Sequence, residues 1–114
     1  MIEPVLVSVL APLVGGRLFP DFAPADTPRP FATYQQVGGQ AGAYVEGAPI
    51  DKKNARMQIN VWGDTRQEAM TLIRAIEDAI VCDPLCGDPL GAPVALYDAA
   101  IGMRGAMQDF SLWG

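Results

Sequence analysis

The alternation of apolar and polar residues is clearest in the middle of the chain. Met57, Ile59 and Val61 point to one side of an extended segment, and the residues between them are mostly polar. This period of two predicts a strand over residues 55–62, in an antiparallel or mixed sheet with one buried and one wet face. Trp62 lies on the polar side, where it is either a rim residue of the core or a contact for another subunit.

A helix is predicted directly after this strand. Thr65 and Glu68 form the Thr-x-x-Glu pattern of a capping box, in which each side chain accepts a hydrogen bond from a backbone N–H group at the helix start. Asp83 and Pro84 end the pattern, so the helix is expected over residues 65–81. The stripe that it would bury consists of Ala69, Leu72, Ile73, Ile76 and Ile80.

The N-terminal segment predicts a second helix. Pro4 suits the first turn, and apolar residues recur at helical spacing as far as Leu13. Pro12 and the two glycines at residues 15–16 should kink or end the helix. Because Val7 makes the other side apolar as well, we expect this helix to be either deeply buried or covered by another subunit.

Shorter elements and connectors fill the rest of the chain. The proline-rich connector over residues 20–30 is expected to be extended and stiff, because proline fixes φ. Residues 38–54 form a long arm without periodicity, which is either a mobile hairpin tip or a segment that becomes ordered against a partner. Further strands are expected at residues 17–19, 31–37, 94–97 and 106–113.

These elements predict one α+β domain over residues 1–114. Its antiparallel or mixed sheet should have four to five strands, with the two main helices packed on one face.

Composition narrows the functional classes. The 114 residues carry a net charge of −5, with no basic cluster beyond Lys52, Lys53 and Arg56. A general basic surface for nucleic acid or membrane is therefore disfavoured. The longest apolar run, residues 5–14, is too short to span a bilayer, and it follows Glu3 where a signal peptide has positive charge. We expect the protein to fold in the cytosol.

Few residues could carry chemistry. The chain has no histidine, the usual general base, and no nucleophile elbow, phosphate-binding loop or dinucleotide fingerprint. Cys82 and Cys86 lack the partners of a zinc site and are expected to be reduced thiols near a helix end. Two pairs of acids are close in sequence: Asp21 with Asp26, and Glu77 with Asp78. Nothing in the sequence fixes their separation, so we expect no catalytic, cofactor-binding or metal-binding residues and no enzyme.

Several segments, taken in order, resemble a known family. They are Gly-Gly-Arg-Leu-Phe-Pro at residues 15–20, Ala-Pro-x-x-Thr-Pro-x-Pro-Phe-x-Thr-Tyr at 23–34, Gln-Ile-Asn-Val-Trp-Gly-Asp-Thr-x-x-Glu-Ala at 58–69 and Asp-Phe-Ser-Leu-Trp at 109–113. A short apolar helix precedes them, and a glycine-rich arm divides them. This order is similar to that of the small tail-completion proteins of tailed bacteriophages and prophages, which are similar in fold to the lambda-type tail terminator and to head-to-tail joining proteins.

The resemblance implies a structural role in virion assembly. Such proteins form rings, commonly hexameric, at the head-proximal end of the tail, where they stop polymerisation of the tail tube and present a surface to the head connector. The implied partners are therefore copies of the chain itself, the tail tube protein and the head connector protein. The resemblance also implies assembly in the cytoplasm of the bacterial host and a final place in the virion tail.

The same resemblance implies that DNA passes through the ring without sequence-specific binding, and no membrane or cofactor is implied. The acidic balance of the chain suits such a channel, because a negatively charged lumen would not hold phosphates.

Contacts with neighbouring subunits or partners are expected at apolar and charged positions. The candidates are Val7, Leu10, Asp51, Lys52, Lys53, Arg56, Trp62 and Trp113. Three alternatives remain open at this point. They are a head-completion or connector protein at the portal side, a small-ligand-binding domain with a ferredoxin-like sheet, and a hydrolase that uses a carboxylate pair.

Overall fold

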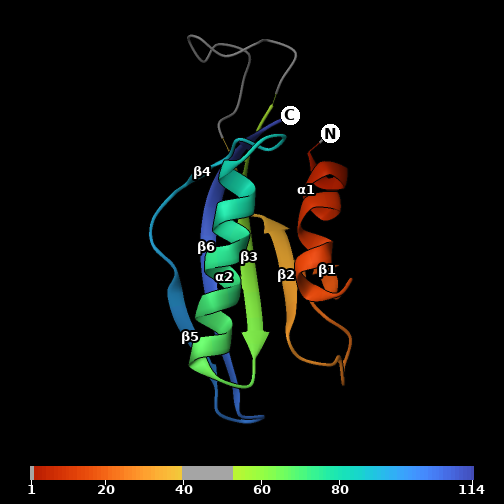
Figure 1. Cartoon of the computed structure of the whole chain (residues 1–114), viewed down its shortest axis with the longest axis vertical. Coiled ribbons are helices and arrows are strands. Elements are labelled where there is room, and N and C mark those ends of the chain that lie inside the picture. The colour runs from red at the N-terminus through yellow and green to blue at the C-terminus, as the bar shows by residue number, and fades with distance from the viewer. Residues whose placement is uncertain (1, 40–52) are drawn as a thin grey trace.

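Two layers make up the computed structural model, which describes residues 2–39 and 53–114: a sheet of six strands, and two α-helices on one of its faces (Figure 1). The helices are α1 (Glu3–Leu10), the short 3-10 helix η1 (Ala11–Val14) and α2 (Arg66–Val81). The strands are β1 (Leu18–Pro20), β2 (Phe31–Gln36), β3 (Asn54–Gly63), β4 (Asp88–Pro89), β5 (Val94–Asp98) and β6 (Met103–Trp113). The predicted α+β class and the placement of both helices on one face are confirmed.

The strand order is β1-β2-β3-β6-β4, and β5 also pairs with β6. β1 runs parallel to β2, and the remaining pairs are antiparallel, so the sheet is mixed. The sheet has one strand more than the sequence predicted. This strand is β4, two residues long, which forms because Asp88 and Pro89 lie opposite Ser111 and Phe110 of β6 rather than because of any pattern of its own.

Alternation along β3 and β6 builds the floor of the core. Met57, Ile59 and Val61 of β3 have no exposed surface, as predicted. On β6 the buried side chains are those of Ala106, Gln108, Phe110 and Leu112. β6 begins at Met103, three residues before its predicted start, because it pairs with β3 as far as Gly63–Arg104 and with β5 as far as Asp98–Met103.

Helix α2 covers this floor with the predicted stripe. Ala69, Ile73, Ile76 and Ile80 are completely buried, and Leu72 packs against the core at its margin. The Thr65 side chain caps the helix by accepting a hydrogen bond from the Glu68 N–H group (3.1 Å). The reciprocal bond differs from a capping box, because Glu68 Oε1 accepts from the Asp64 N–H group (2.9 Å), one residue earlier.

Helix α1 contributes one face to the same core. Leu6 and Leu10 have no exposed surface and Val14 has 1%, whereas Val7 is half-buried and packs against the core from its margin. Leu13, in η1, is 39% exposed. The helix is thus neither fully buried nor bare. After α1 the backbone continues into the 3-10 helix η1, which contains Pro12. The helical segment ends at Gly15, which has a φ of +58°.

The helix α2 ends next to the two cysteines. Both are free and exposed, and the Cys86 N–H group donates to the Cys82 carbonyl oxygen (2.9 Å). Their place near a helix end is as predicted. Within the parts of the chain that the structure describes, no helix is long and apolar enough to cross a bilayer.

Candidate contact surface on the helix-free face

The sheet face opposite the helices carries the candidate site. Because α1 and α2 both pack on the core face, no helix covers the side chains that alternate with the core residues of β3 and β6, and most of these side chains are half-buried. We call this surface the helix-free face. Its members on these two strands include Gln58, Asn60, Trp62, Met107, Asp109, Ser111 and Trp113. Apart from its one ion pair, this surface is polar without charge or apolar, which suits contact with another protein.

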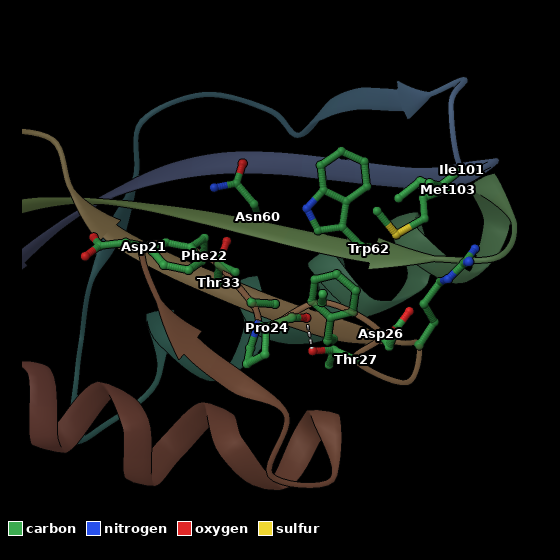
Figure 2. A pocket seen from close by; sticks show the side chains of 14 residues that line it. Asp21, Phe22, Pro24, Asp26, Thr27, Thr33, Asn60, Trp62, Ile101 and Met103 are labelled. Atoms are coloured by element: carbon green, nitrogen blue, oxygen red, sulfur yellow. Dashed lines mark hydrogen bonds between the residues drawn. The ribbon is translucent and has the colours of Figure 1, made fainter.

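The proline-rich connector folds over one end of this face. Phe31 and Thr33 of β2 lie on the helix-free side, yet they are only 8% and 6% exposed. Between the connector, these strands and the turn before β6 lies an open hollow of about 620 Å³ (Figure 2). Residues 21–27 supply one wall, and Trp62, Ile101 and Met103 contribute to the other side.

Trp62 occupies its place because of a glycine on the neighbouring strand. Trp62 lies opposite Phe31 of β2 and opposite Gly105 of β6. A Cβ atom on Gly105 would come within 2.7 Å of both the Trp62 ring atom Cε3 and the Val61 carbonyl oxygen. The absence of a side chain at Gly105 therefore lets the indole approach the β6 backbone. The predicted position of Trp62 on the polar face is confirmed, and its ring lines the hollow.

The rim of the hollow combines exposed apolar and acidic side chains. Phe22 is 78% exposed and Ile101 is 55% exposed. Asp21 and Asp26 both line the hollow, and both have positive φ angles (66° and 62°) within the connector. Figure 2 shows the two acids toward opposite ends of the hollow.

An ion pair holds the connector against the start of α2. It joins Arg29 Nη1 to Asp64 Oδ1 (3.0 Å).

The two residues of the other acidic pair, Glu77 and Asp78, lie in different surroundings. Gln108 Nε2 donates to Glu77 Oε1 (2.9 Å) and to the Gly91 carbonyl oxygen (2.8 Å), so Glu77 takes part in attaching α2 to the connector before β5. Asp78 is exposed. Among residues 2–39 and 53–114, no group of three or more potential metal-ligating side chains occurs.

At the opposite end of the helix-free face, Arg56 and Asp109 form an ion pair within the subunit. Arg56 Nε donates to Asp109 Oδ2 (2.9 Å), and Arg56 Nη2 lies 2.8 Å from the same oxygen. Arg56 is half-exposed and Asp109 largely buried. Next to this pair, Asn54 Nδ2 donates to Ser111 Oγ (2.8 Å). Arg56 can still meet a partner, but its charge is already compensated.

Other predicted contact residues are placed as follows. Val7 borders a shallow depression that Tyr34 also lines. Lys53 is exposed, and its backbone exchanges two hydrogen bonds with Gly114 (2.9 and 3.0 Å). Trp113 is half-buried on the helix-free face, opposite Asn54.

One predicted contact residue is corrected by the structure, and two lie beyond it. Leu10 has 0% exposure and belongs to the core, so its side chain is not available to a neighbouring subunit. Its helical spacing with Leu6 places it on the inner face of α1. Asp51 and Lys52 lie outside the described residues, as does most of the arm.

The structure separates the remaining candidates. Trp62 lies at the hollow, while Arg56 and Trp113 lie at the other end of β3 and β6. Sequence reasoning missed Phe22, Ile101 and Met103 as members of the site. The sequence did hold one indication, the apolar Phe22 inside a polar, proline-rich connector. Only the fold, however, brings Phe22 and Ile101 to the same hollow.

The pKa of Tyr34 is shifted by the surroundings of its phenol group. Tyr34 is 7% exposed, and burial raises the pKa of its phenol above the ordinary value. The carboxylates of Glu3 and Asp21 raise this pKa further, because they oppose a second negative charge nearby.

Comparison with known proteins identifies the family. The model of the family described as "Tail completion protein gp17" matches residues 6–113. The chain belongs to this tail completion family. The predicted family is therefore confirmed, over nearly the whole chain, and the protein is a structural component of phage virions. No curated protein sequence matches the chain.

Two solved structures are similar to this tail completion protein in fold. One is a chain of the "Virion of native gene transfer agent (GTA) particle", with 22% identity and a TM-score of 0.56, covering 93% of this chain and 84% of that chain. The other is the bacteriophage SPP1 gp17 protein, with 18% identity and a TM-score of 0.55, covering 97% of this chain and 86% of that chain.

Proposed function

We propose that this tail completion protein caps the head-proximal end of the tail tube as a ring, most simply of six copies, which ends polymerisation of the tube and joins the tail to the head. The observation that carries the proposal is the family match over residues 6–113. Its partners would be copies of itself, the tail tube protein and the head connector protein. The work is done by surface contacts, and we propose no enzymatic reaction.

The hollow on the helix-free face supports this proposal as a contact site. A closed ring needs a head-to-tail contact, in which one patch of a subunit meets a different patch of its neighbour. Phe22 and Ile101 project from the rim with more than half of their surfaces exposed, and Trp62 forms part of the wall. Exposed aromatic and aliphatic side chains around a hollow are typical of such contacts. We propose that the hollow receives the neighbouring copy in the ring.

The charge of the helix-free face is compatible with the passage of DNA. Among the described residues of β3 and β6 on this face, the basic side chain is Arg56, and it is paired with Asp109. If this face lines the lumen, DNA phosphates meet no free positive charge there, so the duplex is not held by ion pairs. The proposal thus needs no excess of acidic residues in the lumen.

Deletion of the gene tests the function directly. Electron microscopy of lysates should show tails of irregular, excessive length and heads without tails, and the unaltered gene supplied in trans should restore both. Tails of normal length beside filled, unjoined heads would instead indicate a connector protein at the portal side. Normal virions in the absence of the protein would refute the proposed function.

A further inference from the structure

Strand β5 leaves one edge of the sheet open. It pairs with β6 and, among the described residues, with no other strand. Its side chains are largely accessible to solvent, with Val94 52% and Tyr97 56% exposed. An open strand edge offers unpaired N–H and C=O groups to any other chain, and proteins usually protect such edges.

The opposite edge of the sheet has that protection. Strand β1 is three residues long and ends in Pro20, which has no N–H group. The Pro20 carbonyl oxygen already accepts a hydrogen bond from the Phe22 N–H group (2.8 Å). Little of β1 is therefore left for pairing, and the two edges of the sheet are not equivalent.

The pairing pattern shows which residues of β5 direct their backbone groups outward. The Leu90 N–H group donates to the Asp109 carbonyl oxygen (2.9 Å), so the odd-numbered residues of β6 face β4 and β5. Gly105 is such a residue, and Leu96 lies opposite it. Because bonded positions alternate along an antiparallel pair, the backbone groups of Leu96 are directed toward β6.

The residues on either side of Leu96 are therefore the open ones. Ala95 and Tyr97 direct their N–H and C=O groups away from β6. The open stretch is bounded by Pro93, the preceding outward position, which has no N–H group. Two N–H groups and two C=O groups, spaced two residues apart, make up the free edge.

We propose that β5 pairs in antiparallel orientation with β5 of a second copy of this chain, across a two-fold axis at Leu96. In this register, Ala95 lies opposite Tyr97 of the partner subunit, and Tyr97 opposite the partner's Ala95. All the outward groups of both strands then meet a partner, which gives four main-chain hydrogen bonds. Each bulky tyrosine faces a small alanine, so the side chains are complementary as well.

Neighbouring registers are less favourable. A two-fold axis at Ala95 would place Tyr97 opposite the partner's Pro93, which cannot donate, so four hydrogen bonds would still form but the Tyr97 carbonyl group of each subunit would stay unpaired. An axis at Tyr97 would bring two tyrosine rings together, each already covered by an Arg104 guanidinium 3.9 Å from the ring centroid, and would set two positive charges side by side. The register centred on Leu96 avoids both conflicts, and it places Val94 opposite the partner's Asp98.

A two-fold contact of this kind closes at two copies. It is therefore separate from the head-to-tail contact that a ring requires, and it does not depend on the proposed function. The dimer belongs to the free protein, in which it covers the open edge before assembly and so suppresses unspecific strand pairing.

Cross-linking tests the register. The experiment uses the full chain with Cys82→Ser and Cys86→Ser, because both native thiols are exposed. Across the proposed axis the Leu96 positions form a pair without mutual hydrogen bonds, with Cα atoms about 4.5 Å apart, which suits a disulfide. With a thiol oxidant, Leu96→Cys should form a covalent dimer at least about tenfold faster than Val94→Cys, whose counterpart lies opposite Asp98. Equal rates, or no covalent dimer, would overturn the proposal.

Light scattering tests the dimer without any cross-link. The average mass of the unaltered chain should rise from one toward two chains as the concentration is raised. Ala95→Pro removes an outward N–H group, which an edge strand tolerates, and should weaken the dimer by at least about tenfold. Circular dichroism controls for folding, and if this variant unfolds, the cross-linking pair decides alone. A monomer at every concentration, or a dimer unchanged by folded Ala95→Pro, would refute the proposal.

Discussion

At the scale of the residue, Gly105 shows how a missing side chain shapes a surface. A methyl group there would meet the Trp62 ring and the Val61 carbonyl oxygen at 2.7 Å. Gly105→Ala should lower the free energy of unfolding by about 1–3 kcal/mol, as overpacking does. Urea unfolding measures this loss, and a shift in the tryptophan emission of the native state should accompany it.

A double-mutant cycle shows how much of the stability lost in Gly105→Ala comes from the clash with the Trp62 ring. Because the indole accounts for part of the clash, Gly105→Ala should cost less in a Trp62→Ala background than in the unaltered chain. Equal costs in the two backgrounds would mean that the Val61 carbonyl alone excludes the methyl group.

Tyr34 carries a pH dependence at the same scale. Its pKa is raised in the folded state by burial and by Glu3 and Asp21, whereas the unfolded chain loses this proton near pH 10. The raised pKa of Tyr34 therefore contributes fully to the free energy of unfolding below about pH 10, and this contribution is lost as the pH rises through the folded-state pKa. Tyr34→Phe should flatten the decline of the free energy of unfolding above pH 10, measured by denaturant titrations. An identical decline in both proteins would contradict this assignment.

At the scale of the element, the start of α2 depends on one hydroxyl group. Thr65 Oγ1 accepts from the Glu68 N–H group, which otherwise lacks a helical partner. Thr65→Ala should lower the free energy of unfolding by about 1 kcal/mol, while Thr65→Ser should retain most of it. Thermal unfolding followed by circular dichroism compares them, and equal losses for both variants would show that the methyl group matters rather than the cap.

At the scale of the whole molecule, the rim of the hollow should affect assembly more than stability. Phe22 is 78% exposed, so Phe22→Ser should change the free energy of unfolding by no more than about 0.5 kcal/mol. If the hollow receives a neighbouring copy, this variant should fail to restore normal tails in a deletion strain. Val81→Ser is the matched control, since Val81 is also apolar and exposed but lies at the end of α2, and it should complement fully.

The local patterns of the chain could be predicted from its amino-acid sequence. The period of two in β3 and the stripe and cap of α2 depend on neighbours within a few residues, so they could be predicted with their buried faces. The family resemblance rests on segments of the same local kind. Leu10 could not be assigned correctly, because an apolar helix position does not say whether its cover is the same chain or another.

Which residues meet across the sheet could not be predicted from local patterns. The hollow exists because the connector folds back over Phe31 and Thr33, and because Trp62 and Gly105 come opposite each other in register. Strand β4 likewise forms through pairing with β6 rather than through a pattern of its own. These features depend on contacts between residues that are dozens of positions apart. A local sequence pattern does not show which distant residues will come into contact, so these contacts could not be predicted from it.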